Sequence, residues 1–165
     1  MKYLCLIFFV ACLSAGCKED KVQEPYKTGM EGQLLPDIVI QMADSVSYFH
    51  TAAATAGKPQ LLFYYSPTCP YCRAQMRDMI NHLEKWDDHQ IYVVTNADLA
   101  SMKKFTDYFK LSQQKGIIYG RDTGSVIAKK YHLMGVPFTA TFDENKNLKA
   151  AYVGRLNAKS LLSIQ

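Results

Sequence analysis

Residues 60–72 read Gln-Leu-Leu-Phe-Tyr-Tyr-Ser-Pro-Thr-Cys-Pro-Tyr-Cys, and this stretch decides the fold. Its first half, 60–65, is an almost continuous apolar and aromatic run between two prolines, which predicts a buried central strand. A helix is expected to begin at once, because Pro70 is tolerated in a first helical turn. Apolar side chains then recur at helical spacing, at Cys72, Met76, Met79, Ile80 and Leu83.

The two cysteines of this junction are expected to have different environments. Cys69 would lie at the N-terminus of the helix, where aligned peptide dipoles and unpaired backbone amides favour a thiolate. Cys72, three residues later, would point toward the apolar face of the helix and be shielded from solvent. We therefore expect Cys69 to be the nucleophile and Cys72 to be the resolving thiol.

The positions of the 5 cysteines favour a working pair over a structural brace. Cys5 and Cys12 lie in an N-terminal apolar stretch and Cys17 follows it directly, so only Cys69 and Cys72 belong to the folded part of the chain. A disulfide that closes so short a ring stabilises a fold little, because its stabilisation grows with loop length. The short spacing instead lets the second thiol attack a mixed disulfide formed on the first.

Other uses of two close cysteines fit this sequence poorly. A c-type haem site needs His directly after the second cysteine, where Arg73 stands. A structural zinc site needs four ligands, and the chain offers neither a second such cysteine pair nor ligand spacing among its histidines. Pro67-Thr68-Cys69 lacks the wider Pro-to-Thr-to-Cys spacing of peroxiredoxins. We therefore expect no metal and no cofactor beyond the redox-active Cys69–Cys72 disulfide.

Strands and helices alternate after the cysteine pair. The pattern predicts a strand at 91–95, a helix at 98–111 with Met102, Phe105 and Phe109 inward, a strand at 116–119 and a short helix at 125–132. Two strands, 138–142 and 148–153, form a hairpin, and a final helix begins at 157. Upstream, 37–42 and 46–50 predict an N-terminal hairpin. The expected class is α/β, with a central mixed sheet flanked by helices.

Over about residues 34–165 the chain resembles the thioredoxin fold, on two motifs in the expected order. These are the segment from Tyr65 to Cys72 and the tripeptide Gly135-Val136-Pro137. The resemblance implies that Pro137 is cis and lies against the cysteines, and that Val136 offers backbone hydrogen bonds to a substrate polypeptide. Pro70 and Tyr71, between the cysteines, are expected to contact substrate as well. The extra strand and helix before Pro137 are similar to the TlpA-like branch of extracytoplasmic thioredoxins.

The chain departs from the thioredoxin pattern at two positions. Thioredoxins commonly carry a buried acid six residues before the first cysteine, where it helps to deprotonate the resolving thiol, and here Phe63 takes that place. Thr68 replaces the aromatic residue usual just before the first cysteine. The Pro-Tyr dipeptide between the cysteines is similar to that of glutaredoxins, and such replacements are associated with altered redox poise.

The N-terminus reads as a bacterial lipoprotein signal peptide over 1–16. Lys2 precedes an apolar run of about 11 residues, too short for a transmembrane helix, which needs about 20. Leu13-Ser14-Ala15-Gly16-Cys17 resembles a lipobox, so Cys17 is expected to be lipidated, although Leu13 lies one place earlier than usual. Ordinary cleavage with a free Cys17 is the alternative. Residues 17–33 are charged and aperiodic and are expected to form a flexible tether, with the thioredoxin-like domain at 34–165.

Composition and charge narrow the possible partners. The chain is 48% apolar and 12% aromatic, which is enough for a core, and its 165 residues leave room for one domain. A formal net charge of +4, spread along the chain, is too small to indicate nucleic acid. The expected partners are exported protein thiols or disulfides and a membrane redox donor or acceptor, at the periplasmic or surface side of a bacterial envelope.

The resulting hypothesis is thiol-disulfide exchange on exported proteins through Cys69 and Cys72, with a slight preference for the reducing direction. The alternative is a peptide-binding or chaperone-like module without redox turnover, which would hold extended peptide beside Val136 and Pro137. Exposed aromatic residues near the motif would favour that alternative, but most of them are expected to be core.

Overall fold

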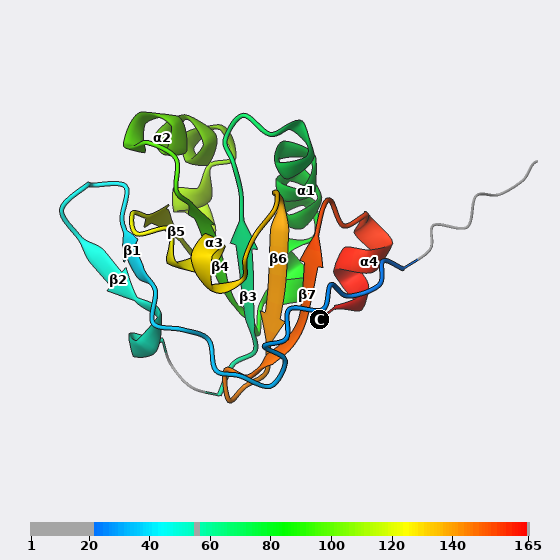
Figure 1. Cartoon of the computed structure of the whole chain (residues 1–165). Coiled ribbons are helices and arrows are strands. Elements are labelled where there is room, and N and C mark those ends of the chain that lie inside the picture. The colour runs from blue at the N-terminus through cyan, green and yellow to red at the C-terminus, as the bar shows by residue number, and fades with distance from the viewer. Residues whose placement is uncertain (1–21, 55–56, 165) are drawn as a thin grey trace, which may run out of the picture.

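The centre of the computed structural model, which describes residues 22–54 and 57–164, is a seven-stranded mixed sheet in the order β2-β1-β5-β4-β3-β6-β7 (Figure 1). The three middle strands β5, β4 and β3 are parallel, and every other pairing is antiparallel. The expected α/β class with a mixed sheet is therefore confirmed. The strands are β1 Val39–Gln41, β2 Tyr48–His50, β3 Gln60–Tyr64, β4 Gln90–Thr95, β5 Ile117–Asp122, β6 Phe138–Phe142 and β7 Leu148–Val153.

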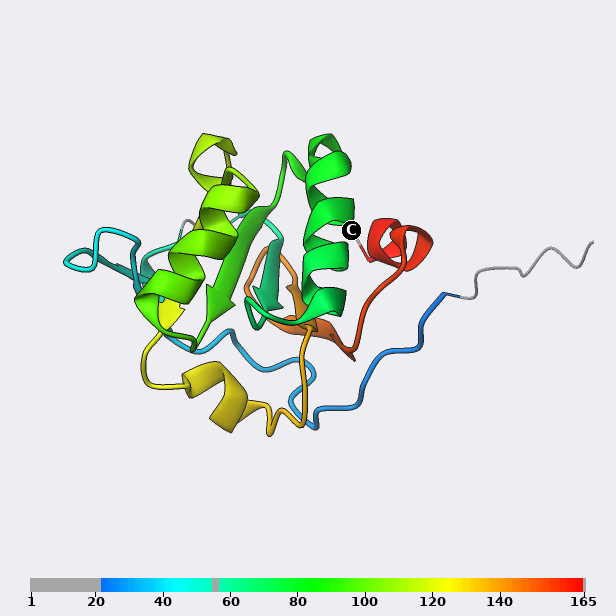
Figure 2. The same cartoon turned by 90° about the horizontal axis from the view of Figure 1, so that it is seen from above.

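Helices cover both faces of this sheet, as Figure 2 shows. Two long helices, α1 and α2, lie on one face with α4 beside α1, and the short α3 lies on the other face. The consecutive parallel strands β3, β4 and β5 require crossover connections, because the end of one strand and the start of the next lie at opposite ends of the sheet. The helices α1 and α2 provide these connections. The helices are α1 Pro70–Asn81, α2 Leu99–Tyr108, α3 Val126–Lys130 and α4 Ala158–Ser163, with 3-10 turns at Thr51–Ala53, Leu83–Trp86 and Leu111–Gln113.

The strand that precedes the cysteines is buried on both faces, as predicted. All five residues of β3 are buried, and successive side chains alternate between two apolar clusters. Leu61 and Phe63 face the cluster under α1, α2 and α4, whereas Leu62 and Tyr64 face the cluster under α3. β3 therefore forms the rigid centre from which the Cys69–Cys72 segment emerges.

Several predicted elements have different bounds in the structure: the N-terminal hairpin strands and the short helix expected at 125–132 are shorter, and two further differences have a clear physical cause. The helix predicted at 98–111 ends at Tyr108, because Lys110 adopts a left-handed conformation with φ of 52° that no α-helix continues. The strand predicted at 116–119 runs on to Asp122, because Arg121 and Asp122 pair with Gln41 and Ile40 of β1. Neither the left-handed backbone at Lys110 nor the pairing of β5 with β1 is encoded in the local residue pattern.

The described part of the expected tether lies against the domain. Between residues 22 and 33 the backbone amides of Gln23, Tyr26 and Gly32 donate hydrogen bonds to Ser160 Oγ and to the carbonyls of Ala151 and Leu148, over 2.9, 2.7 and 2.9 Å. This segment runs beside β7, at the edge of the sheet (Figure 1). The boundary expected at residue 34 stays a prediction, and residues 1–16 and Cys17 lie outside the described residues.

Gly120 is expected to be essential for seating β1 on the sheet. A Cβ atom at this position would lie 2.3 Å from the carbonyl oxygen of Gln41, which is backbone and cannot swing away. Gly120→Ala should therefore cost about 1–3 kcal/mol of unfolding free energy, measured by urea denaturation. Gly135→Ala is the matched control, because a Cβ there meets nothing within 4 Å. Equal stability of the two variants would contradict this account.

Candidate active site

Cys69 is the N-cap residue of α1, and its sulfur serves the helix directly. Its backbone is extended, with φ −74° and ψ 119°, and its Sγ accepts a hydrogen bond from the backbone amide of Cys72 over 3.2 Å. A helix N-terminus leaves its first amides without intrahelical partners, so an electron-rich sulfur at this position is stabilised by the amide and by the helix dipole. The side chain is half-buried, so a partner can reach the sulfur from solvent.

Cys72 has the opposite environment, as predicted. Its side chain is fully buried in the cluster that also contains Met76 and Met79. Burial raises the pKa of the Cys72 thiol far above its ordinary value, and the hydrogen bond with Cys69 raises this pKa further. The pair therefore combines an accessible sulfur held by a helix amide with a shielded thiol that stays protonated at neutral pH.

The structure brings the second predicted motif to the same place. The peptide bond between Val136 and Pro137 is cis, as predicted, and Cys69 Sγ donates a hydrogen bond to the Val136 carbonyl over 3.8 Å. This proximity follows from the sheet order, because Tyr64 at the end of β3 pairs with Phe138 at the start of β6. The loops that carry Cys69 and Val136 must therefore meet.

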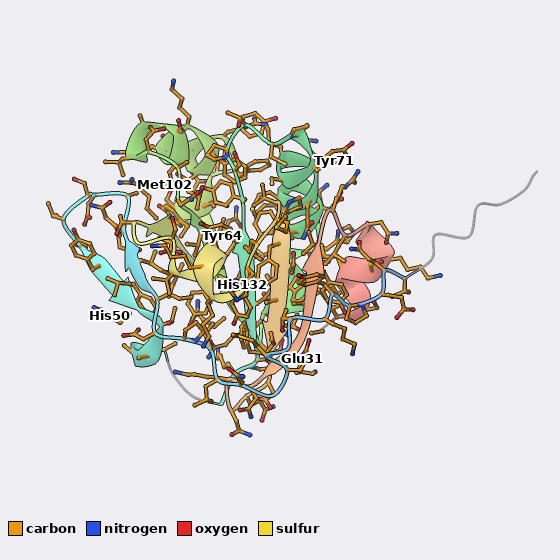
Figure 3. The ribbon with its side chains drawn as sticks, in the orientation of Figure 1. Glu31, His50, Tyr64, Tyr71, Met102 and His132 are labelled. Atoms are coloured by element: carbon orange, nitrogen blue, oxygen red, sulfur yellow. The ribbon has the colours of Figure 1, made fainter. Side chains whose placement is uncertain are left out.

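The residues between the cysteines lie at the surface. Pro70 is exposed, and Tyr71 is 63% exposed and extends outward from the start of α1 (Figure 3). Met134, two residues before Val136, is 95% exposed. Phe63, Tyr64, Tyr65 and Phe138 are core side chains, as expected for most of the aromatic residues near the motif. Contact of Pro70, Tyr71, Val136 and Pro137 with a substrate stays a prediction, as does lipidation of Cys17, which lies outside the described residues.

The helix that carries the cysteines is fastened by a residue that the sequence analysis did not single out. Gln75 is fully buried, its amide nitrogen donates to Thr139 Oγ1 over 2.7 Å, and its amide oxygen accepts from the backbone amide of Leu156 over 3.0 Å. It thereby joins α1 to β6 just past Pro137 and to the loop before α4. The available signal was a polar residue at helical spacing from Cys72, inside an otherwise apolar stripe.

A second fastening holds α1 to α2 next to the cysteine pair. The guanidinium of Arg73 lies over the rings of Tyr108, Phe109 and Phe105, with 4.4, 5.7 and 5.9 Å to the ring centroids. Such cation–π contacts stabilise a pair of helices without placing a free charge in the core.

Among the described residues, no group of three or more His, Cys, Asp and Glu side chains is arranged to hold a metal ion.

The unequal environments of the two thiols predict selective alkylation. Iodoacetamide should modify Cys69 rapidly at pH 7 and leave Cys72 unmodified, because the thiolate is the reactive form and the Cys72 pKa is raised. In a Cys69→Ser variant, alkylation of Cys72 should accelerate about tenfold for each pH unit between 7 and 10, since the thiolate fraction grows in that proportion below the pKa. Mass spectrometry of timed samples measures both rates. Equal modification of the two cysteines at pH 7 would contradict the assignment.

The chain is similar to several proteins of known structure that share its fold. A secreted disulfide oxidoreductase of Mycobacterium tuberculosis is 17% identical, with a TM-score of 0.64 over 77% of this chain and 92% of the other. A putative protein disulfide isomerase of Bacteroides thetaiotaomicron is 18% identical, with a TM-score of 0.66 over 81% and 84%. An exposed lipoprotein thioredoxin of Streptococcus pneumoniae is 17% identical, with a TM-score of 0.61 over 78% and 96%. These likenesses confirm the thioredoxin-like fold.

Sequence comparison gives the family. An uncharacterised protein of Haemophilus influenzae is 25% identical over 126 residues, which are 74% of this chain and 81% of that protein. The Redoxin family matches residues 30–163, a span that contains both cysteines of the site and Pro137. With most of its length matched, the chain belongs to the Redoxin family of oxidoreductases.

Proposed function

We propose that the protein exchanges thiols and disulfides with exported proteins through the Cys69-Pro70-Tyr71-Cys72 pair. The observation that carries this proposal is the geometry of Cys69, whose half-exposed sulfur accepts the Cys72 amide at a helix N-terminus. The buried thiol of Cys72 lies three residues on, within the same first turn. The secreted disulfide oxidoreductase of M. tuberculosis shares the fold and lends support.

In the reducing direction, exchange takes two steps. The Cys69 thiolate attacks one sulfur of the partner's disulfide, forms a mixed disulfide and releases the partner's other sulfur as a thiolate. Cys72 then attacks Cys69 Sγ, so that the mixed disulfide breaks, the Cys69–Cys72 disulfide forms and the partner leaves with both of its sulfurs reduced. The protein loses two electrons and the partner gains them. The Cys72 proton is transferred to the departing sulfur.

We favour the reducing direction over oxidation or isomerisation. The additional strand and helix between α1 and Pro137, which resemble the TlpA-like branch, support this preference. A reductase in an oxidising compartment needs a membrane electron donor, which would restore the Cys69 thiolate after each turnover. The exchange needs no further cofactor, since the cysteine pair itself carries the electrons.

We place the protein at a bacterial membrane, anchored through a lipid on Cys17 after removal of residues 1–16. The lipobox-like ending at Cys17 supports this placement, and the pneumococcal relative in fold is itself an exposed lipoprotein. Among the described residues, no helix is both long and apolar enough to cross a membrane. The active site would thus face exported proteins, in the periplasm or at the cell surface.

Replacing the resolving thiol should trap partners. A Cys72→Ser variant cannot complete the second step, so mixed disulfides between Cys69 and partner proteins should accumulate in cells. Dithiothreitol should reduce these mixed disulfides and release the partners. Non-reducing electrophoresis followed by mass spectrometry identifies them, and the Cys69→Ser, Cys72→Ser double variant is the matched control. Absence of any trapped partner would favour the peptide-binding module without redox turnover.

The reduction potential distinguishes the direction of exchange. Equilibration of the purified protein with graded glutathione or dithiothreitol buffers should give a two-electron transition near the value of thioredoxin, about −270 mV. A value near about −120 mV would instead assign the protein to oxidation or isomerisation. Alkylation of free thiols at each buffer ratio provides the readout.

A further inference from the structure

Two arginines follow the cysteine pair along α1, on the side of the helix that faces α2. Arg73 lies one turn after Cys69, and its backbone amide donates a hydrogen bond to the Cys69 carbonyl over 3.1 Å. Arg77 lies one turn further, so the two arginines start about 6 and 12 Å along the helix from Cys69. Helices α1 and α2 run side by side on one face of the sheet (Figure 2). We call Arg73 and Arg77 the arginine pair.

Tyr108 of α2 contacts both members of the arginine pair. The guanidinium of Arg73 lies 4.4 Å from the centroid of its ring, and Arg77 Nη2 donates a hydrogen bond to its hydroxyl over 3.4 Å. Arg77 and Tyr108 are both exposed, so solvent and partners can reach this surface. A guanidinium that rests on ring faces keeps in-plane N–H donors for another acceptor. The pair therefore presents two cations in a defined place, which lowers the entropic cost of binding an anion.

No acid of the domain neutralises the arginine pair. Within residues 22–54 and 57–164, neither arginine forms an ion pair with a carboxylate. Helix α1 carries one acid, Asp78, and its carboxylate pairs with Arg155 over 2.8 Å. On α2, Lys104 adds an exposed cation one turn before Tyr108, and Asp107 is the exposed acid beside that tyrosine. Cations thus outnumber acids on this surface.

The residues closest to Cys69 in the two motifs carry no charge with which to select a partner. Tyr71 and Met134 are exposed, and Val136 is half-buried. Apolar side chains and backbone groups of this kind can contact many different polypeptides. Discrimination by charge therefore requires groups further from the sulfur, and the arginine pair provides the first charges along α1.

We infer that the arginine pair selects partner polypeptides that carry acidic residues close to the exchanging disulfide, and that it binds their carboxylates while Cys69 attacks. The inference rests on the proposed function, because it names the class of partner that the same exchange favours. Arginine suits this role, since its planar N–H donors match the two oxygens of a carboxylate. An extended chain rises about 3.3 Å per residue, so acids about two to four residues from the partner's cysteine would reach the pair.

The test compares two peptides that each contain an internal disulfide. In one peptide glutamates flank both cysteines, and in the other glutamines replace them, with the same length and no charge. The reduced protein is mixed with each peptide at an ionic strength of about 0.15 M, where charges more than about 8 Å apart are largely screened. Chromatography of acid-quenched samples gives the rate constants of peptide reduction. Division by the rate constants for 2-mercaptoethanol removes the effect that the glutamates have on attack by any thiolate.

We expect the protein to reduce the glutamate peptide about fivefold faster after this correction, as for one or two exposed ion pairs. The preference should vanish near 1 M salt, where the screening length is about 3 Å. Arg77→Glu should abolish the preference, and Arg77→Gln should reduce it to an intermediate value. Lys58→Glu is the matched control and should keep the preference, because it makes the same change of charge at an exposed cation before β3, a whole strand away from the segment that carries Cys69.

The outcomes separate the inference from the function beneath it. If the unmodified protein reduces neither peptide, the proposed exchange fails. If it reduces both at equal corrected rates, or if Arg77→Glu keeps the preference, the role of the arginine pair is overturned and the exchange stands. An equal loss of preference in Lys58→Glu would assign the effect to overall charge and would also overturn the inference. Urea unfolding checks that each variant is folded.

Discussion

The active site depends on how α1 begins. A helix leaves its first backbone amides without partners, and here the sulfur of Cys69 accepts one of them from Cys72. One contact therefore caps the helix and positions the sulfur that we propose as the nucleophile. It requires that the chain leave β3 in an extended conformation and enter α1 within a few residues, which the two prolines of the junction favour. The central position of β3 then fixes what surrounds the sulfur, since β6 on its antiparallel side brings Val136 and Pro137 to it.

Around this junction, the fold creates a difference between two identical functional groups. Cys69 and Cys72 are one helical turn apart, yet one sulfur lies at the surface and the other within the core. Burial raises the pKa of Cys72, so this thiol stays protonated at neutral pH. The surrounding residues hold that difference in place: Gln75 ties the helix to β6, and Arg73 ties it to the aromatic residues of α2. A loosened α1 would let water reach Cys72 and make the two thiols alike.

Much of this could be predicted from the sequence, because the pattern of residues 60–72 combines a two-sided buried strand, a helix start and a paired thiol. The hairpin strands at 138–142 and 148–153 were predicted with their observed bounds, since apolar alternation and a polar turn encode them locally. The rest depends on contacts across the fold. The extension of β5 to Asp122 needs β1 as a partner, and the N-terminal segment is held largely by hydrogen bonds of its backbone, which its side-chain pattern does not encode. The orientations of Gln75 and Tyr65 likewise follow from packing.

If Cys17 carries a lipid as proposed, the segment that runs beside β7 would also limit how far the domain can move from the membrane. Among the described residues, its hydrogen bonds to the domain begin at Gln23. Val153, which accepts the side-chain amide of Gln23 over 3.0 Å, pairs with Phe138 next to Pro137. With Cys17 held in a lipid layer as proposed, five residues lie between Cys17 and Gln23, and the six steps from one to the other span about 20 Å at most. The sulfur of Cys69 would then reach only proteins that come close to the membrane surface. The choice of partner would thus depend on distance from the membrane as well as on the fit to the surface around Cys69.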